Sequence, residues 1–436
     1  MLSGTCQAWP SFSGARSASF WAKAWHSTGR TMINPWPTRF AENVKDFQGY
    51  PIGKTIQYLT DPEIISLAGG LPSPDVFQRS QMRAASAGAL DANIDRIMQY
   101  SPIPGEATLV DAVLGFLERD AIRIGSENIV ITSGGQAGLD LAGRLFLNPG
   151  DTVMVDRPTF AGAIVTFQMQ RPEFIGIDIE KDGSDIVGMR RQLDQLAGRG
   201  HLPKFIYVVP DFQNPSGITM SLAKRVALLD LSYEFDLPII EDSPYRDLRY
   251  RGETIPAIFA LDQQRGGGHV IGLYTFSKLF CPGVRVGFNI GPPEVITRMT
   301  HIKEGAILNT PKWNQDMCTA FLTEWDLEDH LENCRSYYRE KLDVFLNTMT
   351  EHFPPESGVT WTVPEGGLFL WVTVPAHIDT DELFFEAIEH KVAFVPGSQF
   401  YGERPERNHM RINFSFVSKE DLAEAVRRLA DCMRKA

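Results

Sequence analysis

From Asn128 onward the chain repeats one unit, a short apolar run rich in β-branched residues followed by a turn and a longer helical pattern. Several runs lack strict polar alternation, as expected of strands that helices cover on both faces. The runs are NIVIT, DTVMVD, FIGIDI, KFIYVV, LPIIED and HVIGLYTF. This order predicts the α/β fold class with a central, mostly parallel sheet.

After about Pro292 the pattern changes to long helices, which continue through Lys341. The strand patterns GLFLWVTV, VAFVPG and MRINFSFV follow, with a further helical stretch among them. This change predicts a smaller α+β domain. We therefore expect a disordered leader at 1–32, an N-terminal arm at 33–75, a large ligand-binding domain at 76–305 and a small C-terminal domain at 306–436.

Composition narrows the classes of partner. The 54 acidic residues outnumber the 42 basic ones, and a net charge of −12 disfavours broad binding to nucleic acid or an anionic membrane. The five cysteines show no CxxC spacing and the nine histidines form no HExxH motif, so we expect neither a disulfide framework nor a metal site. No apolar run is long enough to predict a membrane span. These features favour a small-molecule partner.

The first residues have the composition of an organelle transit peptide, with Arg16, Lys23 and Arg30 but no acidic residue before Glu42. An upstream translation start, with Met32 as the working one, explains the same composition, and we favour it. The predicted location is therefore cytoplasmic, with mitochondrial targeting by residues 1–32 as the lesser alternative.

Glycines follow the first of the predicted strands directly. Because ligands of α/β sheets bind outside the carboxyl ends of the strands, residues at these positions are the informative ones. In SGGQAG, Gly134 and Gly135 would let the backbone approach an anion while the next helix points its N–H groups at it. The motif predicts a phosphate cradle, although an ordinary turn before a helix has the same pattern.

Polar side chains follow two later strands. Asn214 in DFQNPSG could donate to a ligand oxygen, or it could cap its own backbone in an Asn-Pro turn. Glu241 and Asp242 in EDSPY end a predicted strand, so we expect one carboxylate to be buried there. A buried acid needs a cationic partner or a proton, and a structural salt bridge competes evenly with a cofactor contact.

YTFSKLFCPGVRVGF is the most informative segment, because Lys278 follows an apolar strand. A desolvated lysine has a lowered pKa and becomes a Schiff-base nucleophile. Thr275, Ser277 and Arg285 are the residue types expected around a phosphate dianion. The alternative is a lysine whose charged end reaches out from a strand end to water.

Together these segments resemble the fold type I pyridoxal 5′-phosphate (PLP) aminotransferases, specifically the subgroup of 2-aminoadipate and kynurenine aminotransferases. The resemblance covers roughly Ile64 to the C-terminus. It rests, in order, on ISLAGGLPSPDVF, QYSPIPGEATL, ITSGGQAGLDL, DRPTFAGAI, PDFQNPSG, EDSPYRDL, TFSKLFCPGVRVGF, PEGGLFLWV, VAFVPG and MRINFSFV. It implies a large domain around a mostly parallel sheet, a smaller α+β domain and PLP as cofactor.

The resemblance also implies roles for the catalytic residues. Lys278 matches the lysine that forms the Schiff base and then moves the proton at the substrate α-carbon. Asp242 matches the carboxylate that keeps the pyridine nitrogen protonated. Asn214 and Tyr245 match the donors to the phenolic oxygen of the cofactor.

Further cofactor contacts follow from the same match. The expected phosphate contacts are Gly134, Gly135, Gln136, Thr275, Ser277 and Arg285. Tyr100, in QYSP, matches the tyrosine that reaches the phosphate of the neighbouring subunit, which implies a homodimer with shared sites. Many relatives have serine at Gly135 and tyrosine at Phe160. Here one hydroxyl contact is missing, and the ring expected to stack on the pyridine loses its polar end.

For substrates, Arg411 matches the arginine that grips the α-carboxylate in a bidentate pair, with Gly70 and Asn214 as further contacts. The implied reaction moves an amino group from an aromatic, branched-chain or aminoadipate-like amino acid to a 2-oxo acid, with 2-oxoglutarate as the expected acceptor. Phe160, Phe369 and Trp371 suggest an apolar pocket wall, although such residues more often belong to a core.

Two alternatives remain open at this point. Another PLP reaction, such as elimination, replacement or carbon–carbon bond formation, would use the same scaffold. A PLP-sensing transcription regulator is disfavoured, because no helix-turn-helix pattern precedes ISLAGG.

Overall fold

The computed structural model describes residues 36–45, 47, 49 and 61–434. The predicted leader at 1–32 lies outside the described residues, so its disorder and the choice between cytoplasmic and mitochondrial locations stay predictions. Residues 36–45 contain a 3-10 helix, η1 (Pro37–Arg39), and a short helix, α2 (Glu42–Lys45). From Phe47 onward the chain forms one compact unit, which contains all the other elements.

An eight-stranded sheet forms the centre of this unit. Only β9 and β5 run antiparallel to their neighbours, so the sheet is mixed but mostly parallel. Across the sheet the order is β2 (Ile129–Thr132), β9 (Gly287–Ile290), β8 (Val270–Thr275), β7 (Ile239–Asp242), β6 (Ile206–Val208), β3 (Thr152–Arg157), β4 (Glu173–Glu180) and β5 (Gly183–Ser184).

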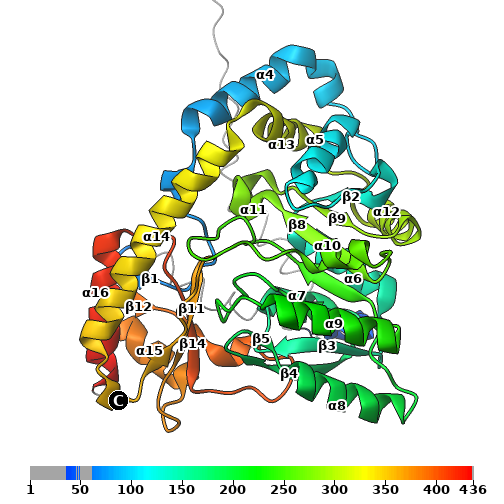
Figure 1. The fold of residues 1–436 in the computed structure, drawn as a ribbon. Coiled ribbons are helices and arrows are strands. Elements are labelled where there is room, and N and C mark those ends of the chain that lie inside the picture. Colours follow the sequence, from blue (N-terminus) through cyan, green and yellow to red (C-terminus); the bar gives the residue numbers. More distant parts are fainter. Residues whose placement is uncertain (1–35, 46, 48, 50–60, 435–436) are drawn as a thin grey trace, which may run out of the picture. The chain divides into compact units, whose positions relative to one another are not determined.

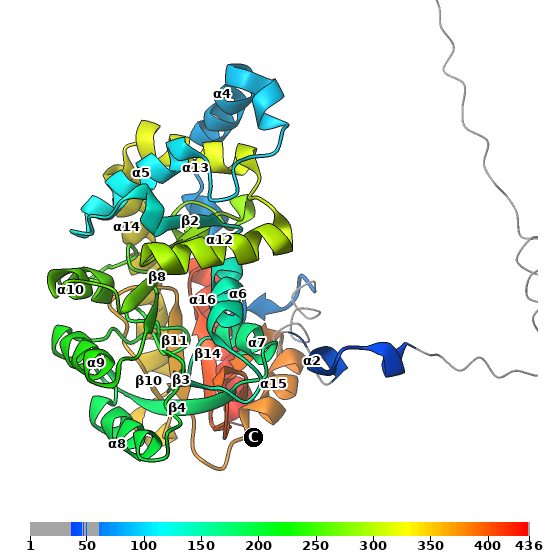
Figure 2. The same ribbon diagram turned by 90° about the vertical axis from the view of Figure 1, so that its right-hand side faces the viewer.

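Helices cover both faces of this sheet, as predicted from the runs that lack alternation of polar and apolar residues. One face carries α6 (Gly135–Phe146) and α7 (Ala161–Gln168), and the other carries α8 (Ile186–Ala197), α9 (Leu222–Phe235) and α10 (Ile258–Gln264) (Figure 2). Along β3, Val153 and Val155 pack into one apolar core while Met154 packs into another. Side chains alternate across a strand, so an entirely apolar strand can supply two cores.

A second, antiparallel sheet is built from the C-terminal strand patterns. Its order is β10 (Thr360–Trp361), β11 (Phe369–Thr373), β14 (His409–Asn413) and β13 (Val395–Pro396). Three helices pack with it: α14 (Leu327–His352), α15 (Thr380–Glu389) and α16 (Lys419–Met433) (Figure 1). This small α+β part confirms the predicted fold class, whereas the exact domain boundaries stay predictions.

The remaining elements join these layers. β12 (Val392–Ala393) pairs in parallel with β1 (Ile65–Ser66), so VAFVPG contains two strands of different sheets. At the top of Figure 1, α13 (Lys312–Glu324) packs against α4 (Arg79–Ile97) and α5 (Ala107–Glu118). The others are α11 (Phe276–Leu279), α12 (Pro293–Ile307), η3 (Pro74–Val76), η4 (Ser126–Asn128), η5 (Pro282–Val284), η6 (Pro355–Ser357) and η7 (Gly397–Phe400).

Four strands were not among the predicted runs: the two-residue strands β1, β5 and β10, and β9 in the central sheet. β9 is short and contains Gly287 and Asn289, two residue types with low strand propensity. Glycine is needed at 287 because a Cβ there would lie 2.5 Å from the Tyr274 carbonyl oxygen. Among the described residues, no helix has the length and apolarity that crossing a membrane requires.

Candidate active site

A cavity of about 460 Å³ opens at the carboxyl ends of β2, β6, β7 and β8. It contains every residue predicted for the site except Gly134 and Tyr100. Its predicted lining residues are Gly70, Gly135, Gln136, Phe160, Asn214, Asp242, Tyr245, Thr275, Ser277, Lys278, Arg285 and Arg411. The segments come from distant parts of the sequence, and the parallel strands bring them to one edge of the sheet.

Lys278 lies on α11, the single turn that follows β8 and is capped by the Thr275 side chain. Its Nζ donates to the main-chain oxygen of Gly70. Burial, together with the positive charges of Arg411 and Arg285, lowers the pKa of Lys278 to about 8. More of this amine is therefore uncharged at neutral pH than an exposed lysine would be, as a nucleophile requires.

The two carboxylates at the end of β7 point to opposite faces of the sheet. Asp242 lines the cavity, and its Oδ2 accepts a hydrogen bond of 2.8 Å from the Tyr207 hydroxyl. Glu241 accepts from the backbone N–H groups of Ile258 and Phe259 at the start of α10. Both are buried, where one was expected, and burial raises both pKa values, that of Asp242 to about 7. Only Asp242 is placed to meet a ligand.

Anion-binding groups converge at the start of α6. Gly134 has a φ of +87°, and a Cβ there would come within 2.5 Å of Arg285 Nη2, so this cradle requires glycine. Arg285 Nη1 donates to Ser277 Oγ at 3.2 Å, and Thr275 Oγ1 donates to the same oxygen at 3.0 Å. A helix N-terminus, two hydroxyls and a guanidinium form a donor set that fits a phosphate dianion. At Gly135, however, a Cβ would meet Thr275 at an ordinary 3.5 Å, so space alone does not exclude serine.

Arg411 lies between two aromatic rings and is only 2% exposed. Its guanidinium carbon is 4.4 Å from the ring centre of Phe369 and 5.0 Å from that of Phe400. Its Nη1 donates to Asn214 Oδ1 at 3.1 Å, and Asn214 Nδ2 donates to the Tyr245 hydroxyl at 3.3 Å. The Asn214 side chain therefore joins two residues of the site instead of capping its own backbone.

The segment 67–73, which we call the strap, forms one wall of the cavity through Gly69, Gly70 and Leu71. Its main-chain oxygens accept hydrogen bonds from side chains of β14, of α11 and of the loop that follows β14. The donors are Arg411 to Ala68 O, Lys278 to Gly70 O and Ser415 to Leu71 O. The strap thus contacts both cationic side chains that face the substrate space.

An amine of lowered pKa, a buried carboxylate and a phosphate cradle in one cavity form the donor set that PLP requires. The family model for aminotransferase class I and II matches residues 63–429. The chain belongs to this family. The aminotransferase is PLP-dependent, and its relatives place it with the aromatic, aminoadipate and kynurenine type.

The similar proteins span nearly the whole chain. The aminotransferase is 35% identical to aromatic-amino-acid aminotransferase 1 of Thermococcus litoralis, over 91% of this chain and 94% of that one. It is 34% identical to 2-aminoadipate transaminase of Thermus thermophilus, over 92% and 97%. The structure of Pyrococcus horikoshii kynurenine aminotransferase, in complex with PMP, superposes with a TM-score of 0.88 at 36% identity, over 93% and 99%.

Two predicted residues of the aminotransferase do not line the cavity. Gly134 lies behind it, against Arg285. Tyr100 is 76% exposed, so its ring contributes nothing to the cavity of its own chain. The next residue, Ser101, donates to the Thr310 carbonyl, and the Thr310 hydroxyl lies 3.3 Å from that of Ser133 beside the cradle. The segment that carries Tyr100 is thereby anchored close to the outer side of the cradle.

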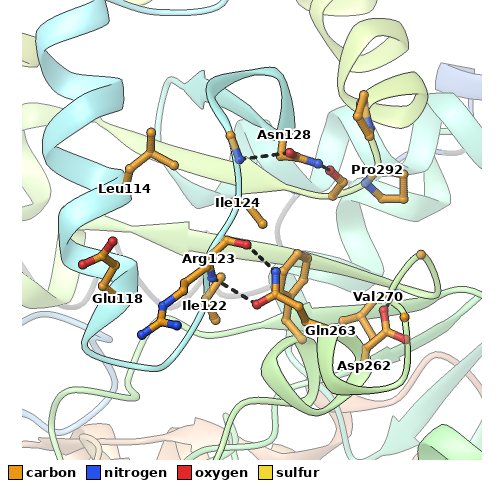
Figure 3. A pocket seen from close by; sticks show the side chains of 17 residues that line it. Leu114, Glu118, Ile122, Arg123, Ile124, Asn128, Asp262, Gln263, Val270 and Pro292 are labelled. Carbon is orange, nitrogen blue, oxygen red and sulfur yellow. Dashed lines mark hydrogen bonds between the residues drawn. The ribbon is translucent and has the colours of Figure 1, made fainter.

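A larger cavity, of about 710 Å³, lies at the opposite edge of the sheet, beside Asn128 and Val270 (Figure 3). Its two amide side chains form hydrogen bonds with the backbone of the cavity walls. Gln263 accepts from the N–H of Arg123 and donates to its carbonyl. Asn128 accepts from the N–H of Gly125 and donates to the carbonyl of Gly291. These side chains therefore tie loops together and leave the smaller cavity as the candidate active site.

Several features of the site differ from those predicted from the sequence. The unpredicted lining residues include Leu139, Val209, Pro244 and Pro282. Trp371 does not line the cavity but stacks on His409, with ring centres 5.4 Å apart, whereas Phe160 and Phe369 do line it. Leu71 was not predicted as a wall residue, although it stands next to the predicted Gly70. Tyr207 was also missed, because its contact with Asp242 depends on strand pairing that no motif records.

Proposed function

We propose that the aminotransferase moves the α-amino group of an L-amino acid with an aromatic or other large apolar side chain to 2-oxoglutarate. The proposal rests mainly on one observation: Arg411, the expected partner of the α-carboxylate, lines the same cavity as Lys278. Leu71 and Phe369 add apolar surface to the same cavity. The names of the relatives, which include aromatic and kynurenine aminotransferases, support the same class of donor.

In this proposal one set of the residues that line the cavity would hold PLP. Bound PLP supplies an electron-withdrawing ring that stabilises negative charge on the substrate α-carbon. Asp242 would place a negative charge beside the pyridine nitrogen, and Asn214 and Tyr245 would donate to the phenolic oxygen. Phe160 would contact the ring. The phosphate would be held by Gly135, Gln136, Thr275, Ser277 and Arg285, with Gly134 behind them against Arg285.

A second, overlapping set of lining residues would hold the substrate. Arg411 binds the α-carboxylate, while Asn214 and Gly70 line the adjoining space. Lys278, once free of the cofactor, holds and moves the proton at the α-carbon. Amino acid and 2-oxo acid share the α-carboxylate, so both substrates use the same arginine in turn.

A donor panel tests this function. Aromatic, branched-chain and aminoadipate donors would be offered with 2-oxoglutarate, and glutamate formation measured. We expect the highest kcat/KM for aromatic donors, because Leu71 and Phe369 present apolar surface to the substrate. Aminoadipate as the best donor, or no glutamate with any donor, would overturn the proposed donor class or the proposed acceptor.

Replacing Arg411 with lysine should raise the KM of both amino acid and 2-oxo acid, because lysine cannot form the bidentate pair. We expect a loss of about 2–4 kcal/mol in kcat/KM for each substrate. The visible absorbance of bound PLP should stay unchanged. Arg407→Lys is the control, since Arg407 pairs with Asp379 and Asp381 on the surface. Equal losses for amines with and without a carboxylate would make Arg411 a structural residue.

We also propose a homodimer with shared active sites. Large apolar side chains are exposed along α4 and near the start of α13, including Ile94, Met98 and Trp313. Tyr100 is exposed beside them and faces none of its own cavity. An exposed apolar surface of this kind is typical of an interface, and a phosphate contact across it would explain the position of Tyr100.

Tyr100→Phe should therefore weaken PLP retention about ten-fold, the value of one hydrogen bond to a charged group. PLP dissociation would be measured by absorbance after dilution, with sedimentation confirming that the variant still associates. A fully active monomer at assay concentration would contradict the proposal of shared sites.

A further inference from the structure

Tyr207 and Asp242 are neighbours on one face of the central sheet. Tyr207 lies in β6 opposite Ile240 of β7, in parallel register. Asp242 is two residues beyond Ile240, so its side chain projects from the same face as those of Ile240 and Tyr207. The strand pairing thus places the phenol directly behind the carboxylate, on the side away from the cavity opening.

The contact is buried and fixed. Tyr207 is fully buried, and its ring packs edge-on against Phe167 with ring centres 5.7 Å apart. The hydroxyl donates to Asp242 Oδ2 at 2.8 Å. Across the described residues, this is the single side-chain hydrogen bond to that carboxylate. Because Oδ2 is occupied, Oδ1 is the oxygen that remains for a ligand in the cavity.

We propose that Tyr207 is a positioning residue for the PLP reaction: its hydroxyl orients the Asp242 carboxylate and stabilises its negative charge, so that Oδ1 can hold the proton of the pyridine nitrogen. This inference rests on the proposed function, in which Asp242 faces that nitrogen.

The physical reason is competition for one proton. Burial raises the pKa of Asp242 to about 7, and the bond from Tyr207 opposes that rise. Burial and the adjacent carboxylate raise the pKa of Tyr207 well above its ordinary value, so the phenol stays a donor. Without this donor the carboxylate becomes more basic and draws the proton away from the pyridine nitrogen. The cofactor would then withdraw electrons less strongly.

The test measures that proton directly, independently of turnover. Protein loaded with PLP that is ¹⁵N-labelled at the pyridine nitrogen would be examined by NMR as wild type, Tyr207→Phe and Asp242→Ala. We expect Asp242→Ala to move the resonance to the deprotonated position and Tyr207→Phe to move it part of the way. The accompanying fall in kcat/KM for Tyr207→Phe should be about ten-fold, as for one hydrogen bond to a charged group.

Tyr274→Phe is the matched control. Tyr274 is buried in the adjacent strand β8, and within the described part of the chain its hydroxyl has no hydrogen-bond partner. Its removal should leave the resonance in place. Should Tyr207→Phe fold poorly, 3-fluorotyrosine introduced at 207 keeps both ring and hydroxyl. Because fluorine makes the phenol a stronger donor, the resonance should stay at the wild-type position or move further toward the protonated one.

The outcomes separate the two proposals. A shift with Asp242→Ala but none with Tyr207→Phe overturns the role of Tyr207 alone. No shift with Asp242→Ala overturns the proposed role of Asp242 and this inference with it. Equal shifts for Tyr207→Phe and Tyr274→Phe, or a shift toward the deprotonated position with 3-fluorotyrosine, would show general damage to the sheet and overturn the inference.

Discussion

Replacing Lys278 with alanine is expected to lower turnover by about 10³-fold or more, because both the covalent attachment of PLP and the proton transfer at the α-carbon depend on this amine. Borohydride treatment should fix PLP to the wild-type chain at Lys278 and leave the variant unlabelled. The site of labelling would be read by mass spectrometry of the digested protein.

Lys303 provides the control for this prediction. It is also buried, its Nζ donates to the Ile103 carbonyl, and burial lowers its pKa to about 8, yet it does not line the cavity. Lys303→Met should keep the borohydride label at Lys278. Labelling of Lys303 or of any other lysine in the wild-type protein would show that Lys278 is not the lysine that binds PLP.

Asp242→Ala has the second largest expected effect. The substitution leaves the pyridine nitrogen without a negative partner, and the expected fall in kcat is about 10²-fold or more, since a hydrogen bond to a charged group contributes about 1.5–3 kcal/mol and the charge also supports the transition state. The rate would be measured at saturating PLP, so that weaker cofactor binding is not counted.

Glu241→Gln is the matched control, because it changes the neighbouring carboxylate on the other face of β7. Glu241 bonds the start of α10, so this variant should unfold at a lower temperature while keeping its turnover when folded. Near-normal turnover of Asp242→Ala, or an equal loss of turnover in Glu241→Gln, would remove Asp242 from the proposed role.

The central sheet could be predicted because its strands are apolar on both faces and end in glycines or polar residues. β9 could not, since Gly287 and Asn289 conceal it. The division of VAFVPG between two sheets could not be predicted either. Val392 and Ala393 pair with β1, whereas Val395 and Pro396 pair with β14. Local propensity carries no information about such long-range partners.

Single motifs in the site were ambiguous for the same reason. Nothing in DFQNPSG distinguishes a self-capping Asn214 from one that joins Arg411 to Tyr245, because both partners lie elsewhere in the chain. The ordered set of motifs removed this ambiguity for residues that face the cavity. The motifs could not identify Tyr207, because its position next to Asp242 is set by the pairing register of β6 and β7.

The strap has a consequence for mutational scanning. Its contacts with Arg411, Lys278 and Ser415 are made by main-chain oxygens, which survive any ordinary side-chain substitution. Even Gly70→Ala should be tolerated, since its Cβ would meet Phe369 at 3.4 Å. A scan of 68–70 would therefore score these main-chain contacts as dispensable, and only changes that alter the backbone itself, such as Gly70→Pro or an ester in place of the amide, would reveal their contribution.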